Sequence, residues 1–186
     1  MGVDPGTQIT GYGLIRQTGG ELSLMICGVI KMGKLQDTHP AKLGKIFKRL
    51  LQLVETYKPD EMAVEAPFFG KNVQSMLKLG RVQGVAMAAA LQRDVPVTEY
   101  APRKIKKAVT GNGNASKMQI AGLLPQLLPE LKREATPEFL DATDALATAV
   151  CHAFQQFPQT GGKSSRRKNY SSWEAFLKEN PERRGS

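Results

Sequence analysis

Cysteine, histidine and aromatic residues are scarce in this chain of 186 residues, which has two cysteines, two histidines and 6% aromatic residues. Cys27 and Cys151 both lie inside apolar runs, and nothing in the sequence calls for a disulfide. We therefore expect two buried thiols in a reducing cytoplasm. We assign no catalytic role to His39 or His152, so a reactive site has to be sought among other residue types.

Long hydrophobic runs are absent as well. No apolar run approaches the roughly 20 residues that a membrane span needs, and no charged segment followed by an apolar one opens the chain. We therefore expect neither a membrane span nor a secretory signal. The length and an apolar content of 41% suit one globular domain with a modest tail.

Acidic residues are outnumbered, at 17 against 26 basic residues, which gives a formal net charge of +9. The excess is shared, because residues 159–186 carry a net charge of +4 and the remainder +5. Such a charge predicts a polyanionic partner, with nucleic acid as the leading candidate. An anionic membrane surface is the weaker alternative, since no basic amphipathic helix with bulky apolar residues is evident.

The hydrophobic pattern predicts an α/β domain built around one mixed sheet. We expect strands over residues 1–5, 8–17, 21–32, 61–65 and 95–100, with Gly19-Gly20 closing a hairpin. We expect helices over residues 41–57, 73–92, 102–109, 115–124 and 136–154, with Pro125 breaking the fourth of them. Residues 1–155 would form the domain. Residues 156–186 would form a basic, flexible tail that either docks locally or binds a partner or DNA.

Four acidic residues stand at the ends of core elements: Asp4, Glu65, Asp141 and Asp144. A carboxylate in such a place is costly unless it is compensated, and Asp141 and Asp144 share one face of a helix. Taken singly, each could serve a turn, a solvated strand end or a helix dipole. Taken together they repel one another unless a cation lies between them. Because Mg²⁺ prefers oxygen ligands, a metal-dependent phosphoryl-transfer site is the first hypothesis.

Four sequence blocks extend this hypothesis: GVDPGTQITGYGL, EAPFFGKNVQSMLKLG, AVTGNGNASKMQI and DATDALATAVCHA. In this order and at this spacing they closely resemble the RuvC family of Holliday junction resolvases, over about residues 2–154. The resemblance implies a ribonuclease H-like fold, with a five-stranded mixed sheet flanked by helices. The chain departs from the family pattern in having only three residues before Asp4, in the position of Arg81, and in its basic tail.

The resemblance implies a Mg²⁺-dependent crossover junction endodeoxyribonuclease that makes paired symmetric nicks in homologous recombination and DNA repair. Asp4, Glu65, Asp141 and Asp144 would be both catalytic residues and metal ligands. They would hold two Mg²⁺ ions per active site, with Mn²⁺ as a substitute and Asp4 as the bridge between the ions. The expected products carry 5′-phosphate and 3′-hydroxyl ends.

The same blocks supply candidate DNA contacts. Phe68 matches the family's aromatic residue that inserts at the junction, whereas Phe69 is assigned to packing. Polar and basic residues of the second and third blocks, and of the segment before the third, would contact phosphates or bases. They are Lys71, Asn72, Arg103, Lys106, Lys107, Asn112, Asn114 and Lys117, with Lys104 in the same basic segment.

Two symmetric cuts in a four-way junction require two active sites, which predicts a homodimer. The helix over residues 73–92 offers a seam of small residues with bulky neighbours. The small residues are Gly80, Gly84, Ala86, Ala88, Ala89 and Ala90, and the bulky ones Met76, Leu77, Leu79 and Val85. By resemblance the protein is a cytoplasmic bacterial one, nucleoid-associated when on DNA. A branch-migration helicase complex of the RuvA/RuvB type would be its partner.

Three alternatives stay open at this point. Another nuclease of the same fold would act on RNA:DNA hybrids, and the GNGNASK and FFGKN segments argue against it. The phosphotransferase and actin-like ATPase group shares a motif like DPGTQITG, but it needs two such domains to enclose a nucleotide. A non-catalytic junction-binding protein could dispense with all four acidic residues, yet the four blocks show no such loss.

Overall fold

The computed structural model describes residues 1–33, 38–67, 72–131 and 137–156, apart from the side chains of residues 137–139. The expectations for Phe68, Phe69, Lys71 and the tail from residue 157 onward lie outside the described residues. No helix in the described part of the chain is long and apolar enough to cross a membrane.

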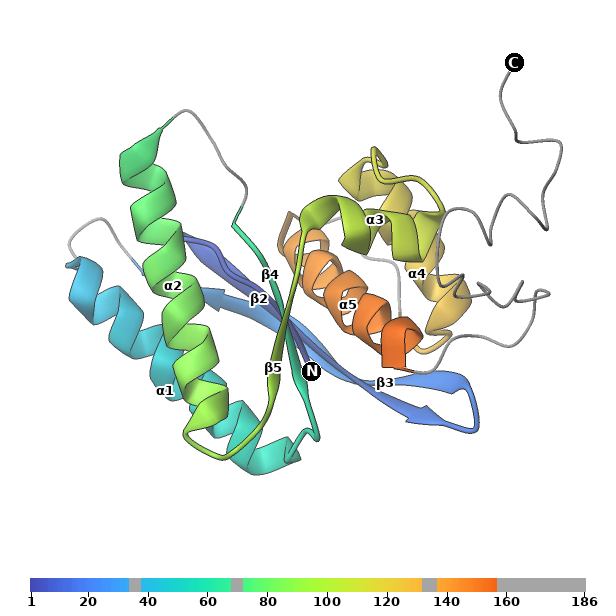
Figure 1. Cartoon of the computed structure of the whole chain (residues 1–186), viewed down its shortest axis with the longest axis horizontal. Helices are drawn as coiled ribbons and strands as arrows, with labels where there is room; N and C mark the ends of the chain where they lie inside the picture. Colours follow the sequence, from blue (N-terminus) through green and yellow to red (C-terminus); the bar gives the residue numbers. More distant parts are fainter. Residues whose placement is uncertain (34–37, 68–71, 132–136, 157–186) are drawn as a thin grey trace, which may run out of the picture.

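A five-stranded sheet in the order β3-β2-β1-β4-β5 forms the centre of the molecule (Figure 1). Its strands are β1 (Gly2–Asp4), β2 (Ile9–Thr18), β3 (Glu21–Lys31), β4 (Met62–Glu65) and β5 (Val97–Tyr100). β1 pairs antiparallel with β2 and parallel with β4. β2 and β3 form an antiparallel hairpin, and β4 pairs parallel with β5. The predicted mixed sheet is therefore confirmed.

Helices cover both faces of this sheet (Figure 1). One face carries α1 (His39–Tyr57) and α2 (Val73–Leu91), and the other α3 (Pro102–Thr110), α4 (Lys117–Leu127) and α5 (Pro137–Gln156). The strand period separates two cores: Met62 and Val64 of β4 pack with α1 and α2, while Ala63 packs with α3, α4 and α5.

The predicted helix limits agree with the structure to within about two residues, with one exception. Pro125 was expected to break the fourth helix, but α4 continues through it to Leu127. Leu124 and Leu128 are both fully buried on either side of the proline. We infer that their burial outweighs the one backbone hydrogen bond that a proline removes.

The β2–β3 hairpin turns at Gly19 and Gly20, as predicted. Both residues have positive φ angles, +60° and +95°, which glycine adopts without a steric penalty. The thiol prediction holds for Cys151, which is buried in α5, and only in part for Cys27, which is half-buried on β3.

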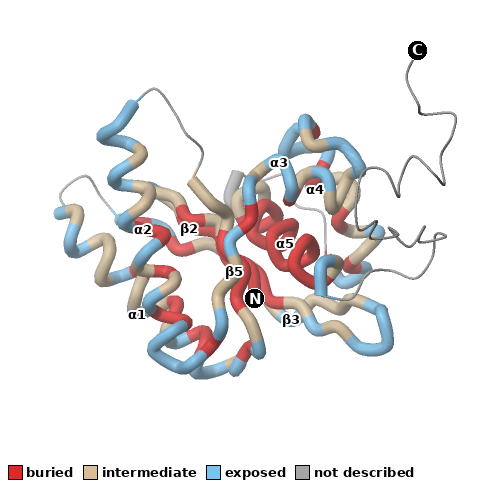
Figure 2. The backbone as a smooth tube through the Cα atoms, viewed as in Figure 1, coloured by how far each residue is buried: buried red, intermediate tan, exposed pale blue. Residues whose placement is uncertain are grey.

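Helix α5 is the most deeply buried helix and packs directly on the sheet (Figure 2). Glycines in β1 and β2 permit this approach. A Cβ atom on Gly2 would lie 2.2 Å from the carbonyl oxygen of Ala145, and one on Gly11 would lie 2.2 Å from that of Asp141. Because glycine has no side chain, Gly2 and Gly11 let α5 approach the sheet, and this approach sets how close Asp141 and Asp144 come to it.

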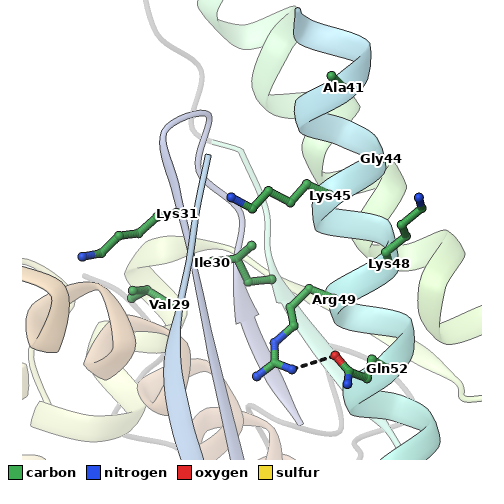
Figure 3. A pocket seen from close by; sticks show the side chains of 9 residues that line it. All are labelled: Val29, Ile30, Lys31, Ala41, Gly44, Lys45, Lys48, Arg49 and Gln52. Atoms are coloured by element: carbon green, nitrogen blue, oxygen red, sulfur yellow. Dashed lines mark hydrogen bonds between the residues drawn. The ribbon is translucent and has the colours of Figure 1, made fainter. Parts of the chain in front are cut away.

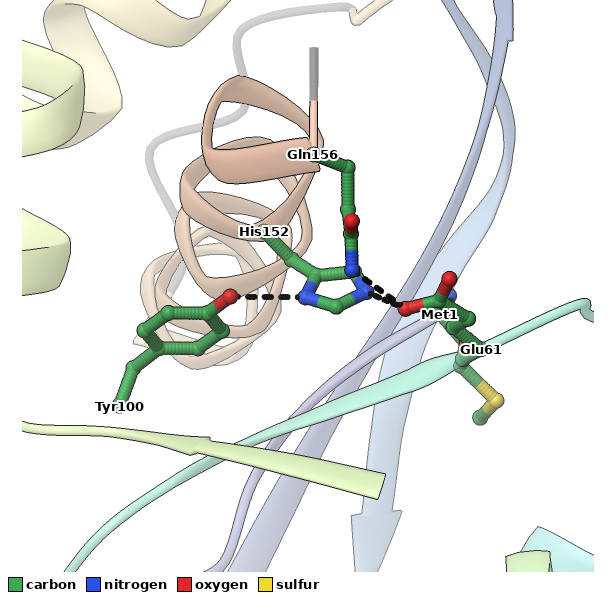
Figure 4. A network of polar contacts seen from close by, with 5 residues as sticks. All are labelled: Met1, Glu61, Tyr100, His152 and Gln156. Atoms are coloured by element: carbon green, nitrogen blue, oxygen red, sulfur yellow. Dashed lines mark hydrogen bonds and ion pairs between the residues drawn. The ribbon is translucent and has the colours of Figure 1, made fainter. Parts of the chain in front are cut away.

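A polar network fixes the other end of α5 (Figure 4). Tyr100 Oη lies 2.9 Å from His152 Nδ1, and His152 Nε2 lies 2.7 Å from Glu61 Oε2. The Gln156 side chain donates a second hydrogen bond to Glu61, at 2.9 Å. His152 is buried, and burial raises the pKa of Tyr100. The network links α5 to β5 and to the residue before β4, so the contacts of His152 stabilise the fold.

Candidate active site

Two carboxylates meet at one end of the sheet, because β1 and β4 are adjacent and parallel and each ends in an acidic residue. Val3 pairs with Val64, so Asp4 and Glu65 come next in register. A tight turn follows Asp4. The Gly6 amide donates to Thr10 Oγ1 at 3.3 Å, and the Thr10 hydroxyl donates back to the Gly6 carbonyl at 3.1 Å.

Helix α5 brings the other two carboxylates to the same place. Asp144 is 8% exposed, whereas Asp141 is only partly buried. Lys117 approaches them from the first position of α4, with its Nζ 2.5 Å from Asp144 Oδ2 and 3.5 Å from Asp141 Oδ1. Ser116 fixes the start of α4 through a capping box with Gln119, which sets the position of Lys117.

The four blocks of the sequence thus converge on one cleft of about 700 Å³. One wall carries Asp4, Glu65 and Asp144. The opposite wall comes from α3, the loop after it and the start of α4, and it carries Arg103, Lys106, Asn114 and Lys117. An acidic wall suits metal ions, and a basic wall suits the phosphate groups of a substrate that binds together with those ions.

The carboxylates of the cleft have raised pKa values, because the positive charge of Lys117 only partly offsets their burial and their mutual repulsion. Burial, reinforced by the neighbouring Asp144, raises the pKa of Asp4 to about 6. Burial and the charges of Asp4 and Asp144 raise the pKa of Glu65 to about 8. Burial also raises the pKa of Asp144, although Lys117 opposes it. Shifts of this kind are common at functional sites, and a bound cation would oppose them.

The residues fit a divalent metal ion in chemical type and in charge. All the donors are carboxylate oxygens, which hard cations prefer. Asp144 Oδ2 is buried and has no hydrogen-bond partner within the described chain, apart from its ion pair with Lys117. No three acidic, histidine or cysteine side chains of the described residues surround one point as ligands. The Lys117 ammonium lies beside Asp141 and Asp144 instead.

The predicted DNA contacts divide into two groups. Arg103, Lys106, Asn114 and Lys117 line the cleft, whereas Lys107 and Asn112 do not. The Asn112 side chain instead accepts a hydrogen bond from the Asn114 amide at 3.0 Å and so orders the loop.

Two further candidates have other contacts. Asn72 Oδ1 accepts from the Ser75 amide at 3.1 Å and caps α2. Lys104 lies over the ring of Tyr100, with its Nζ 4.9 Å from the ring centroid.

The sequence had indicated Lys117 as a DNA contact, and its ion pairs with Asp141 and Asp144 were missed. They join residues 24 and 27 positions apart in the chain, so no local pattern contains them. The pattern Ser116-x-x-Gln119 was a usable signal, because it marks a helix start and places Lys117 at the first turn.

Replacement of Lys117 by glutamine is expected to tighten the binding of a divalent ion by about tenfold, since the ion no longer competes with the ammonium group for Asp144. Calorimetric titration with Mn²⁺ measures this affinity. Lys107→Gln is the matched control, because it removes the same charge from a position outside the cleft. Unchanged or weaker Mn²⁺ binding by Lys117→Gln would contradict the competition.

Comparisons with known proteins identify the family of the chain. The sequence model of the family described as "Crossover junction endodeoxyribonuclease RuvC" matches residues 1–152. The RuvC protein of Porphyromonas gingivalis is 55% identical over 186 residues, covering 98% of this chain and 95% of that protein. The RuvC protein of Bacteroides fragilis is 54% identical over 183 residues, covering 98% and 94%.

Among solved structures, that of Thermus thermophilus RuvC in complex with a Holliday junction substrate superposes with a TM-score of 0.75. It is 32% identical and covers 83% of this chain and 92% of its own. The likeness confirms the predicted ribonuclease H-like fold. The chain belongs to the RuvC family of crossover junction endodeoxyribonucleases.

Proposed function

We propose that this protein resolves four-way DNA junctions by paired, metal-dependent nicks at the cleft between Asp4, Glu65, Asp144 and the basic wall. Nucleases of its family depend on divalent metal ions in general. The observation that carries the proposal is the meeting of half-buried and buried carboxylates of raised pKa with Arg103, Lys106 and Lys117 in one cleft. Metal ions suit the acidic wall of this cleft, and a phosphodiester suits its basic wall.

The four carboxylates would hold two Mg²⁺ ions, or Mn²⁺ in their place. Asp4 comes next in register beside Glu65, and its pKa is raised by burial and also by the charges of Asp144 and Asp141, so it is our candidate for the ligand shared by the two ions. Bound Mg²⁺ supplies charge neutralisation at the phosphate and a water molecule of lowered pKa. Asp4, Glu65 and Asp144 supply the negative charge that retains the ions. Asp141 is more exposed and serves as the outer ligand.

The basic wall would position the substrate. Arg103 Nη2 donates to Asn114 Oδ1 at 3.2 Å, which joins α3 to the following loop and holds both groups at the cleft. Lys117, which pairs with Asp144 in this structure, could instead bind a phosphate oxygen if a cation took its place at that carboxylate. By family resemblance, Phe68 would insert between bases, with Lys71, Asn72, Lys107 and Asn112 as outer contacts. The products would carry 5′-phosphate and 3′-hydroxyl ends.

A homodimer formed through α2 would supply the second active site. Its exposed stripe consists of Val73, Leu77, Gly84, Ala88 and Leu91, at helical spacing. A Cβ atom on Gly84 would meet nothing within 4 Å, so a partner helix could approach closely there. One expectation needs correction: Ala86, Ala89 and Ala90 are fully buried in the chain's own core and cannot form the seam.

Replacement of Leu77 by glutamate is expected to convert the dimer to a monomer, because a charge would enter the centre of the exposed stripe. Analytical ultracentrifugation measures the change, and junction cutting should then yield uncoordinated single nicks. Ser75→Glu is the control, since it adds the same charge to an exposed position on a different face of α2. A Leu77→Glu protein that remains dimeric would exclude α2 as the seam.

The same proposal extends to the rest of the chain. We place the nuclease domain at residues 1–155 and the basic tail at 156–186. We place the protein in the bacterial cytoplasm, which agrees with the buried thiol of Cys151. There it would meet a branch-migration helicase complex of the RuvA/RuvB type during recombination and repair.

The test is a cleavage assay with a synthetic four-way junction and a linear duplex of the same sequence, with Mg²⁺ and with chelator. We expect paired symmetric nicks in the junction only, and only with Mg²⁺. Equal cutting of the linear duplex, or cutting in chelator, would overturn the proposal.

A further inference from the structure

A second groove lies away from the active site, between the first half of α1 and the end of β3 (Figure 3). Its volume is about 970 Å³, larger than that of the active-site cleft. Lys45 and Arg49 extend from α1 toward β3, and Lys31 points outward from the strand. Lys48 stands on the outer side of the helix.

Among the residues that the structure describes, every charged residue that lines this groove is basic. Residues 39–49 of α1 contain four lysine or arginine residues and no acidic residue. The amino-terminal half of a helix favours negative charge, so basic residues there gain nothing from the helix itself. The one acidic residue of α1, Glu55, is paired with Arg93 and does not line the groove. Lys45, Lys48 and Arg49 therefore give the α1 side of the groove a positive charge.

Two details suit a bound polyanion. Gly44 lies in the groove at the middle of α1, where glycine destabilises a helix relative to alanine. A Cβ atom there would meet nothing within 4 Å, so no neighbour in the described chain requires the glycine, and a ligand backbone could approach the helix closely. Arg49 is also held in place, because its Nη1 donates to Gln52 Oε1 at 2.7 Å.

The groove starts at the same end of the sheet as the active site. Lys31 of β3 pairs with Ile9 of β2, and Gly11 of β2 pairs with Asp4. Two strand spacings, roughly 10 Å, therefore separate the end of β3 from the end of β1. DNA bound at the carboxylates would extend past the edge of the sheet toward Lys31 and α1.

We propose that the groove between α1 and β3 binds the sugar-phosphate backbone of a junction arm, away from the phosphate that is cut. The inference rests on the proposed function, which brings a four-armed polyanion to this end of the sheet. DNA is favoured over a protein partner, because the exposed large hydrophobic residues of the described chain all lie elsewhere and an interface core needs such residues. The contact carries no base specificity.

The test measures binding of a synthetic four-way junction in chelator, by fluorescence anisotropy over a series of salt concentrations. The variant Lys45→Gln/Lys48→Gln should bind about tenfold more weakly, and the slope of log K against log salt should fall by about two. Arg16→Gln/Lys58→Gln is the matched control. It removes two charges from exposed positions that line a different pocket at the opposite end of the sheet, and it should bind like the unmodified protein.

A second variant tests the groove without removing a lysine. Gly44→Glu adds a carboxylate in open space and improves helix propensity, so it should fold and yet weaken junction binding. If both groove variants match the control in affinity and salt slope while the unmodified protein binds and cuts the junction, the groove proposal alone is wrong. If the unmodified protein fails to bind or cut the junction, the proposed function and the groove proposal are both overturned.

Discussion

Asp4→Asn is expected to slow junction cutting by at least about 10³-fold while junction binding stays near that of the unmodified protein. The substitution keeps the shape of the side chain and removes a charge that shares the cleft with Glu65 and Asp144. A loss of several kcal/mol of metal-dependent stabilisation corresponds to this factor, since 1.4 kcal/mol is about tenfold in rate. Binding is retained because its main contacts are between basic residues and phosphates.

Single-turnover cleavage and anisotropy on the same junction separate the two effects. Asp60→Asn is the matched control, because it removes an exposed carboxylate that lines a pocket at the other end of the sheet. We expect it to cut at the normal rate. An Asp4→Asn protein that cuts normally would falsify the assignment of the metal site.

In chelator, the free energy of unfolding is expected to fall by an amount on the order of 7 kcal/mol as the pH rises from 4 to 8. The pKa of Asp4 is raised from 3.8 to about 6, and that of Glu65 from 4.5 to about 8, chiefly by burial. Between these values the folded protein binds more protons than the unfolded chain, so its stability decreases with rising pH. The stabilisation is complete below about pH 4 and lost above about pH 8.

Urea unfolding at several pH values, with chelator and with Mg²⁺, tests this dependence. Mg²⁺ should remove most of the loss at pH 8, because a bound cation compensates the ionised carboxylates. Glu65→Gln should flatten the profile in chelator, and its difference from the unmodified protein separates the site from other titrating groups. Stability that stays constant or rises between pH 5 and pH 8 in chelator would show that the carboxylates are not strained by burial.

The sheet and most helix limits were predictable because their signals are local. The apolar and β-branched residues of β2 and β3, the Gly19-Gly20 turn and the apolar stripe of α1 each lie within about 20 residues. The continuation of α4 through Pro125 was not predictable in this way. It depends on the burial of Leu124 and Leu128 against other elements, which overrides the local preference.

The site was predictable in part. Asp4 and Glu65 follow apolar strands, and the carboxyl ends of adjacent parallel strands meet, so their proximity followed from the pattern once the pairing was assumed. The ion pair of Lys117 with Asp144 depends on the packing of α4 against α5. The distance between α5 and the sheet depends on Gly2 and Gly11, whose role is visible only once the helix is in place.

Other polar contacts illustrate the same limit. Glu61, Tyr100 and His152 come from three separate elements, and only the fold brings them to one network. The basic groove is different, because the run Lys42, Lys45, Lys48 and Arg49 without an acidic residue was visible in the sequence. The sequence did not show that the end of β3 at Lys31 lies beside α1, and this neighbour turns a charged helix face into a groove.

The central claim is that the carboxylates of β1, β4 and α5 together hold divalent metal ions. Anomalous diffraction from crystals grown with Mn²⁺ tests it most directly. The account predicts one or two Mn²⁺ peaks within about 2 to 2.5 Å of oxygens of Asp4, Glu65 and Asp144, with the Lys117 ammonium displaced from Asp144. The account is contradicted if saturating Mn²⁺ gives no peak in this cleft and Lys117 stays bound to Asp144.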